Sequence, residues 1–144
     1  MKIDRQAVHN KCGGRCAYCG EQIEFKDMQV DHYWPQFLSH LQPGLDPNRF
    51  DNLMPSCRPC NIHKHGMRPA TWRSELGLQI IRLRKNPQFG RALRFGQVQI
   101  TETPILFYFE NGLRRDAKGE GDLPKHAHRR KRWACGPKRP VKGG

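Results

Sequence analysis

The chain has 144 residues, enough for one compact domain with a tail or for two very small domains. Only 36% of the residues are hydrophobic, so we expect a small core that needs additional stabilisation. Lys and Arg number 26 against 13 Asp and Glu, which gives a net charge of +13. Solubilising surfaces usually carry a net charge of about 2–8. The excess indicates a polyanionic partner, most often nucleic acid.

The sequence has no stretch of about 18 apolar residues, so it predicts no membrane-spanning segment. The first residues, MKIDRQAVHNK, lack the apolar centre of a signal peptide. We therefore expect a soluble, cytoplasmic protein. Thiols stay reduced in that compartment, so the six cysteines indicate metal binding before disulfides.

The first half of the chain predicts a mixture of short elements. Residues 3–12 are expected to form a short helix, and residues 21–34 show the partial alternation of a hairpin with one buried face. Residues 35–50 carry three prolines and a glycine and are expected to form a long loop. A further helix is expected from near Cys57 to Gly66, which would cap its C-terminal end.

The second half begins with the clearest helical pattern of the chain, over residues 71–85, with Thr71 as its N-cap. A shorter helix is expected over residues 87–95. Residues 97–101 and 104–110 are rich in β-branched, aromatic and other apolar side chains, and we expect two strands there, the second one buried.

These elements predict three parts. We expect a compact core over residues 1–66, an extension of helices and strands over residues 67–110 that packs on the core, and a basic tail over residues 111–144. The tail has 11 Lys or Arg against 3 Asp or Glu and contains several glycines and prolines. This composition is typical of a disordered segment.

The cysteines form two C-x-x-C pairs, Cys16 with Cys19 and Cys57 with Cys60. This spacing suits two thiolates on one tetrahedral zinc ion, and two such pairs complete a closed structural site. A redox motif would need a thioredoxin-like βαβ setting, of which the sequence shows no sign, and disulfides conflict with the expected compartment. A bound zinc ion would supply folding free energy that the small core lacks. Cys12 is expected to pack at the end of the first helix and not to bind the ion.

Asp31 and His32 stand side by side within an apolar stretch. Asn52 follows them before the second cysteine pair, and Asn61 comes directly after Cys60. If zinc clamps the two cysteine pairs together, Asn61 faces the strand that carries Asp31 and His32. Mg²⁺ prefers oxygen ligands, here Asp31 and the side-chain carbonyl of Asn61. A neutral histidine can take a proton from water near pH 7. The set therefore fits phosphodiester cleavage.

The adjacency of Asp31 and His32 carries a geometric condition. Neighbours on a regular strand point to opposite faces, so the two side chains can share a site only where the strand bends, bulges or ends. We expect Tyr33, Trp34 and Pro35 to turn the chain into the long loop at this point.

The segments CAYCG, VDHYWP and DNLMPSCRPCNIHK, in this order, resemble the HNH endonucleases, which are ββα-metal nucleases with an added four-cysteine zinc site. The resemblance covers about residues 12–65. It implies an α+β fold with a small, treble-clef-like, zinc-stapled ββα core, followed by a C-terminal extension of helix and short strands and a basic tail. It also implies a metal-dependent DNA endonuclease whose products carry a 5′-phosphate and a 3′-hydroxyl.

The resemblance implies a role for each matched residue. His32 would be the general base that activates water. Asp31 and Asn61 would hold one catalytic divalent cation, Mg²⁺ or another such as Mn²⁺ or Ni²⁺, beside the structural Zn²⁺ ion. Asn52 would orient the His32 ring, directly or by bracing the loop. The motif ends in Asn61, where other family members have His; either residue can bind a metal.

The helix expected to start near Cys57 carries three candidates for DNA contact. Lys64 matches a lysine that is frequent in the family, and its implied role is contact with a phosphate. Arg58 and His63 are further candidates on the same helix. The expected partner is double-stranded DNA.

Two other interpretations stay open. A zinc-stapled DNA-binding module without catalysis would explain the charge and the cysteines, but it has no need of Asp31, His32, Asn52 and Asn61 together. An accessory subunit of a phage or restriction machine would dock a protein partner through residues 71–110. The chain beyond residue 66 shows a weaker similarity to extensions of phage and prophage HNH proteins, which suggests an origin in a mobile element and a place in the cytoplasm of a bacterial host.

Overall fold

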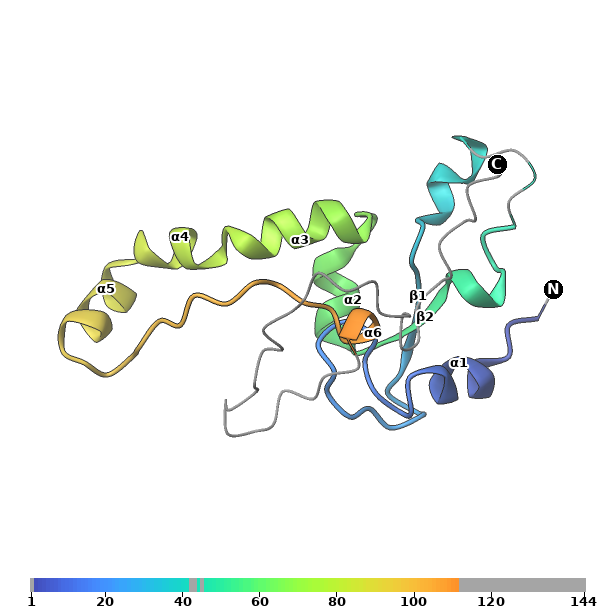
Figure 1. Ribbon diagram of the computed structural model, residues 1–144, viewed down its shortest axis with the longest axis horizontal. Helices are drawn as coiled ribbons and strands as arrows, with labels where there is room; N and C mark the ends of the chain where they lie inside the picture. The colour runs from blue at the N-terminus through green and yellow to red at the C-terminus, as the bar shows by residue number, and fades with distance from the viewer. Residues whose placement is uncertain (1, 42–43, 45, 112–144) are drawn as a thin grey trace. The chain divides into compact units, whose positions relative to one another are not determined.

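The structure is a computed structural model that describes residues 2–41, 44 and 46–111 (Figure 1). The chain divides into two compact units. The first holds the chain up to Gly66 and again from Leu106, and the second is Met67–Ile105. The chain therefore leaves the first unit and returns to it. The predicted tail lies outside the described residues except for Asn111.

The first unit is built on two strands and a helix. β1 (Gln29–His32) pairs antiparallel with β2 (Leu53–Ser56) in an unbroken register that sets Asp31 opposite Met54. α2 (Arg58–Lys64) follows β2 directly, and Figure 1 shows the two strands side by side. The predicted α+β class with a small ββα core is confirmed.

The hairpin predicted over residues 21–34 is wrong. Gln22 pairs with Arg15 in an isolated antiparallel bridge, and a turn over residues 25–27 separates it from β1. The hydrogen-bonding partner of β1 is β2, which lies beyond the long loop. Alternation in the sequence reveals a buried face, but it does not identify the strand that supplies the hydrogen bonds.

The long loop between the strands contains two 3-10 helices, η1 (Gln36–Leu41) and η2 (Phe50–Asn52). α1 (Arg5–Lys11) is attached to the end of this loop. The Lys11 ammonium donates hydrogen bonds of 2.7 to 3.2 Å to three backbone carbonyl oxygens there, those of Phe50, Asp51 and Leu53. Burial lowers the pKa of Lys11 to about 8. This side chain fixes the first helix beside β2.

The returning chain packs on the turn that contains the first cysteine pair. The backbone N–H groups of Tyr108 and Phe109 donate to the carbonyl oxygens of Tyr18 and Ala17, at 2.9 and 2.8 Å. The rings of Phe107 and Phe109 stack with 5.6 Å between centroids, and both meet the Tyr18 ring edge-on. All three rings are buried and form the centre of the small core.

The strand predicted over residues 104–110 is therefore wrong, because this segment ends in a short helix, α6 (Tyr108–Asn111). Its apolar side chains are buried as expected, but against the cysteine-bearing turn and not in a sheet. Gly20 makes this approach possible. It has a φ of +79°, and a Cβ on it would lie 3.0 Å from the Tyr108 ring.

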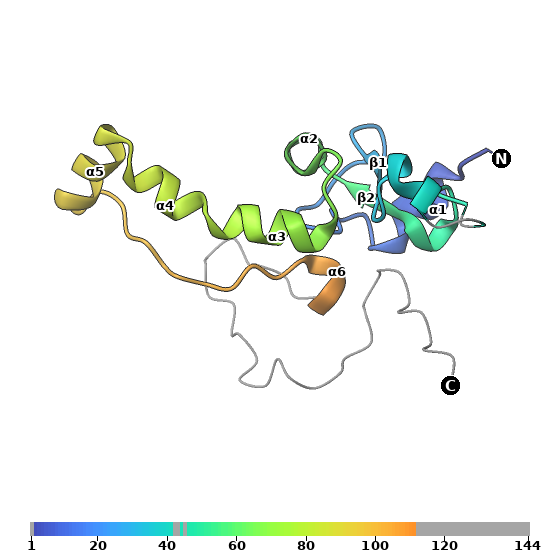
Figure 2. The same cartoon turned by 90° about the horizontal axis from the view of Figure 1, so that it is seen from above.

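The second unit consists of α3 (Pro69–Gly77), α4 (Gln79–Arg84), α5 (Pro87–Arg94) and the chain that follows them (Figure 2). The helix predicted over residues 71–85 is split in two immediately after Gly77, the residue type with the lowest helix propensity apart from proline. It also starts earlier than predicted.

Arg68 is the N-cap of α3, so Thr71 lies inside the helix and is not the cap. The strand predicted over residues 97–101 is absent from the described structure of this unit. The chain there runs back along the helices without forming a strand. The Arg73 guanidinium holds it by donating to the Ile105 carbonyl oxygen at 2.7 Å.

Among the described residues, no helix is long and apolar enough to cross a membrane.

Candidate active site and metal centre

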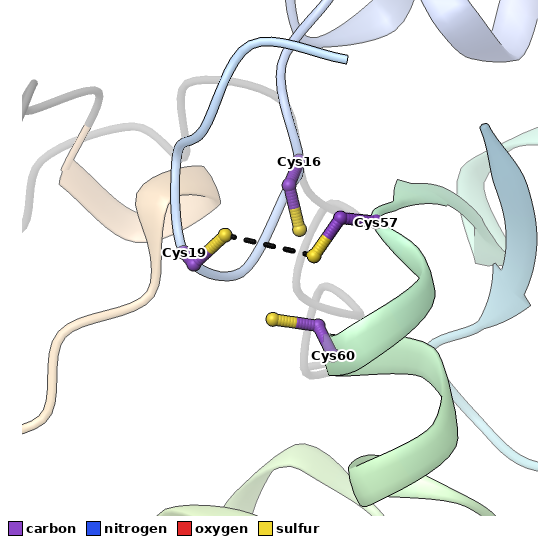
Figure 3. Close-up of side chains that lie close together, drawn as sticks. All are labelled: Cys16, Cys19, Cys57 and Cys60. Atoms are coloured by element: carbon purple, nitrogen blue, oxygen red, sulfur yellow. Dashed lines mark hydrogen bonds between the residues drawn. The ribbon is translucent and has the colours of Figure 1, made fainter. Parts of the chain in front are cut away.

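The four predicted cysteine ligands converge from two elements. Cys16 and Cys19 lie at the turn over residues 17–19, while Cys57 is the N-cap of α2 and Cys60 lies in its first turn. The four Sγ atoms lie within 4.8 Å of one another and point into a common space (Figure 3). A tetrahedral zinc ion with bonds of about 2.3 Å sets its sulfur ligands roughly 3.8 Å apart. The Sγ atoms of Cys19 and Cys57 are 3.8 Å apart, so the group has the dimensions of a metal site.

The electrostatics of the group also favour a cation. A hydrogen bond from the Cys19 thiol lowers the pKa of Cys16 to about 2, and the same bond raises the pKa of Cys19 to about 12. Hydrogen bonding to Cys16 raises the pKa of Cys60, and burial raises that of Cys57. One thiolate is thus stabilised by its neighbours, and further thiolates need a positive charge between them. Cys12 is buried at the end of α1 and is not a member of the group.

β1 ends at His32, and Tyr33 and Trp34 bend into the loop. The predicted end of the strand is confirmed. The two adjacent side chains enter different surroundings, because Asp31 is buried and His32 is only half-buried.

The Asp31 carboxylate is held through one of its oxygens. The Tyr18 hydroxyl donates a hydrogen bond to Oδ2, and the Lys64 ammonium lies 2.9 Å from the same atom. Burial raises the pKa of Tyr18 well above its usual value, and the charge of Asp31 raises it further, so this hydroxyl stays a donor. Oδ1 takes no hydrogen bond or ion pair among the described residues. One oxygen of the carboxylate is therefore fixed and the other is available.

Lys64 does not lie where the sequence-based prediction put it. Its side chain is 0% exposed, and its ammonium also donates to the His32 carbonyl oxygen at 3.0 Å. An ammonium buried in these contacts cannot reach a DNA phosphate without breaking them, so the predicted phosphate contact by Lys64 is corrected to an internal ion pair. The other two candidates on α2, Arg58 and His63, are exposed, and their contact with DNA stays a prediction.

The His32 ring is oriented by a residue that the sequence analysis did not single out. Its Nε2 lies 3.0 Å from the side-chain Oδ1 of Asn48, in the loop between the strands. A carbonyl oxygen only accepts, so in a neutral ring this contact favours the tautomer with its proton on Nε2 and its lone pair on Nδ1. No local pattern marks Asn48, because it is one of several polar residues in a loop next to Pro47.

Asn52 lies behind this contact and does not touch the ring. Its side-chain Oδ1 accepts from the Trp34 backbone N–H at 2.8 Å. Its Nδ2 donates to the carbonyl oxygens of Trp34, at 3.1 Å, and Pro47, at 2.8 Å. These bonds tie the bend after β1 to the loop segment that carries Asn48. Asn52 was expected to orient the His32 ring either directly or by bracing the loop, and its contacts are those of a residue that braces the loop.

Asn61 lies three residues before Lys64 in α2, so the two share one face of the helix. Its side-chain amide makes no hydrogen bond among the described residues. Asn61 therefore lies on the face of α2 that carries Lys64 and meets β1.

The HNH endonuclease family model matches residues 16–66, which span both cysteine pairs, β1, β2 and α2. This segment is an HNH endonuclease domain. It makes up about a third of the chain, and it contains every site residue named above.

Cas9 of Actinomyces naeslundii is similar to part of this chain, both as a curated sequence and as a solved structure. The CRISPR-associated endonuclease Cas9 of Actinomyces naeslundii is 36% identical over 66 residues, which are 46% of this chain and 6% of that protein. The crystal structure of the type II-C Cas9 enzyme from Actinomyces naeslundii matches 51% of this chain and 7% of the other, with 34% identity and a TM-score of 0.42. The chain thus spans a small fraction of the length of this relative.

Proposed function

We propose that the protein is a metal-dependent DNA endonuclease whose HNH domain hydrolyses phosphodiester bonds. The match of residues 16–66 to the HNH endonuclease family is the observation that carries this proposal. The net charge of +13 supports DNA as the substrate, since it favours a polyanion.

His32 is the proposed general base. The contact from Nε2 to Asn48 supports this role, because it leaves the Nδ1 lone pair to accept a proton from the attacking water. Asn48 is the proposed positioning residue for the ring. Asn52 supports the arrangement indirectly through its bonds to Trp34 and Pro47.

Asp31 Oδ1 and the Asn61 side-chain oxygen are the proposed ligands of the catalytic cation. The chemistry of this donor set fits a hard divalent ion such as Mg²⁺ or Mn²⁺, because both atoms are oxygens and neither is bonded to another group in the described part of the chain. Such a cation, when bound, would neutralise the charge that grows on the scissile phosphate and on the leaving oxygen.

The four cysteines are the proposed ligands of a structural zinc ion. Four sulfur donors at tetrahedral spacing support zinc over a hard cation. The expected contribution is to folding, since the ion would join the turn that carries Cys16 and Cys19 to the start of α2.

Cleavage of supercoiled plasmid tests the proposal. The wild-type chain is expected to nick or linearise the plasmid with Mg²⁺ or Mn²⁺, and EDTA is expected to stop the reaction. His32→Ala should abolish cleavage while zinc content and thermal unfolding stay unchanged. His40→Ala is the matched control, because His40 lies in the loop that follows β1, is exposed and contacts only the nearby carbonyl oxygen of Phe37 among the described residues. Cleavage by His32→Ala at the wild-type rate would remove His32 from the mechanism.

A second candidate is a DNA-binding module without catalysis. The ion pair between Lys64 and Asp31 favours it to some degree, because the ammonium cancels the charge of the one proposed carboxylate ligand. Retardation of DNA on a gel without cleavage in Mg²⁺, Mn²⁺ or Ni²⁺ would select this function over the nuclease.

A further inference from the structure

The Asp31 carboxylate is held by donors from both halves of the cysteine group. Tyr18 lies between Cys16 and Cys19, and Lys64 lies on α2, the helix that starts at the second cysteine pair. Both donors act on Oδ2, so they fix the orientation of the carboxylate and leave Oδ1 as the atom that a cation can approach. The two donors are thus placed to position the proposed metal ligand.

The second consequence concerns charge. The Lys64 side chain is 0% exposed and that of Asp31 is 7% exposed, so water and salt screen this pair far less than they screen a surface pair. The pair carries no net charge. Among the described residues, the four cysteines are the only group of three or more His, Cys, Asp or Glu side chains that could hold a metal ion. Asp31 therefore belongs to no cluster of acids. A divalent cation at Oδ1 would therefore bind a carboxylate whose negative charge is already balanced by the Lys64 ammonium.

We propose that the Lys64–Asp31 ion pair makes binding of the catalytic cation depend on the DNA substrate. The inference rests on the proposed function, because it assumes a cation at Asp31. Without DNA, the cation gains little from a carboxylate whose charge an ammonium already balances. A bound phosphodiester adds a negative charge and an oxygen ligand at the same place, and the cation then binds well. The ion pair thus disfavours binding of the cation until the DNA substrate is bound.

Thermodynamic linkage turns this into a measurable equality. If DNA raises the affinity for the cation by some factor, the cation must raise the affinity for DNA by the same factor. A lysine that only stabilised the fold would change the unfolding free energy and would leave this factor untouched.

The experiment uses the full-length, zinc-loaded chain with His32→Ala, so that DNA is bound but not cut. Mn²⁺ is the probe, because the electron paramagnetic resonance signal of the free ion counts the unbound fraction. Titrations are made with and without a short duplex, and a duplex-only titration is subtracted. We expect Mn²⁺ to bind at least tenfold more tightly with DNA, which corresponds to about 1.4 kcal/mol. Equal Mn²⁺ affinities in the two titrations would overturn the proposal.

Two variants on the same background connect the factor to the ion pair. Lys64→Gln removes the charge but keeps an N–H donor for Asp31 and for the His32 carbonyl oxygen. It should bind Mn²⁺ more tightly without DNA, so DNA should raise its Mn²⁺ affinity by a smaller factor. Lys64→Arg keeps the charge and should show the factor of the parent chain. A factor that is the same in Lys64→Gln as in Lys64→Arg would overturn the role of the charge. If Lys64→Gln does not fold, the titrations on the parent chain still decide the coupling.

Plasmid cleavage by the wild-type chain in Mn²⁺ separates this inference from the proposed function. Cleavage together with equal Mn²⁺ affinities would overturn the coupling and leave the nuclease standing. Absence of cleavage together with absence of Mn²⁺ binding to the DNA complex would overturn both.

Discussion

Replacing Lys64 with Met should be among the most destabilising single substitutions in the HNH domain. The variant keeps the apolar stem of the side chain and removes an ammonium that is 0% exposed and lies 2.9 Å from Asp31 Oδ2. It leaves a carboxylate that is 7% exposed without its counter-charge. Removing one partner of a buried pair typically costs about 3–5 kcal/mol. Small domains have unfolding free energies of roughly 5–15 kcal/mol, so the loss is a large share of the total.

The assay is urea unfolding followed by tryptophan fluorescence, at a fixed free zinc concentration because release of the proposed zinc ion would be linked to unfolding. Lys26→Met is the matched control. Lys26 pairs with Glu24 at 3.2 Å, but these side chains are 75% and 73% exposed, and surface pairs contribute about 0–1 kcal/mol. The double variant Lys64→Met with Asp31→Asn should be more stable than Lys64→Met alone, since no unpaired charge remains. A loss below about 1 kcal/mol in Lys64→Met would refute the reasoning, because it would match the surface control.

Three further outcomes follow from individual contacts. In Asn48→Ala, long-range proton–nitrogen NMR of the His32 ring should show a mixture of neutral tautomers, whereas the wild-type ring should carry its proton on Nε2; an unchanged tautomer would mean that Asn48 does not orient the ring. Cys57→Ser should lose the bound zinc and unfold the HNH domain, and a folded variant without zinc would refute the structural role of the ion. The lowered pKa of Lys11, about 8, means that between this pH and its ordinary value near 10.5 the unfolded chain binds a proton that the folded chain lacks. The unfolding free energy of the wild type relative to Lys11→Met should therefore rise with pH across this window, and a flat difference between pH 7.5 and pH 10 would contradict the burial of the ammonium.

Local spacing in the sequence was enough to predict the group of four cysteines and the helix α2. Two cysteines separated by two residues can reach one ion whatever the rest of the chain does, so the pairs Cys16/Cys19 and Cys57/Cys60 predicted a group that the structure brings together. The helix after Cys57 was also predicted, because its start and end depend on neighbouring residues. Even here one detail differed: the residue with a positive φ at the end of α2 is His65, at +50°, and not Gly66.

Two predictions failed because they depended on a distant partner. The alternation over residues 21–34 indicated a hairpin, yet the hydrogen bonds of β1 come from β2, on the far side of a long loop. The apolar run over residues 104–110 indicated a strand, yet Phe107 and Phe109 are buried against Tyr18. A pattern of side chains reports that a face will be buried, but which surface covers it is decided by the tertiary packing.

The same division runs through the candidate site. The sequence by itself made Asp31, His32 and Asn61 the candidates, because their residue types and order are typical of one chemistry. Only the tertiary structure assigned their partners, in Asn48 for the His32 ring and in Lys64 for the Asp31 carboxylate. The physical reason is that a lysine in a sequence is an exposed cation by default, and burial turns it into a counter-charge. Burial is a property of the whole fold, and here it moved Lys64 from the expected DNA surface to the carboxylate on which the proposed cation depends.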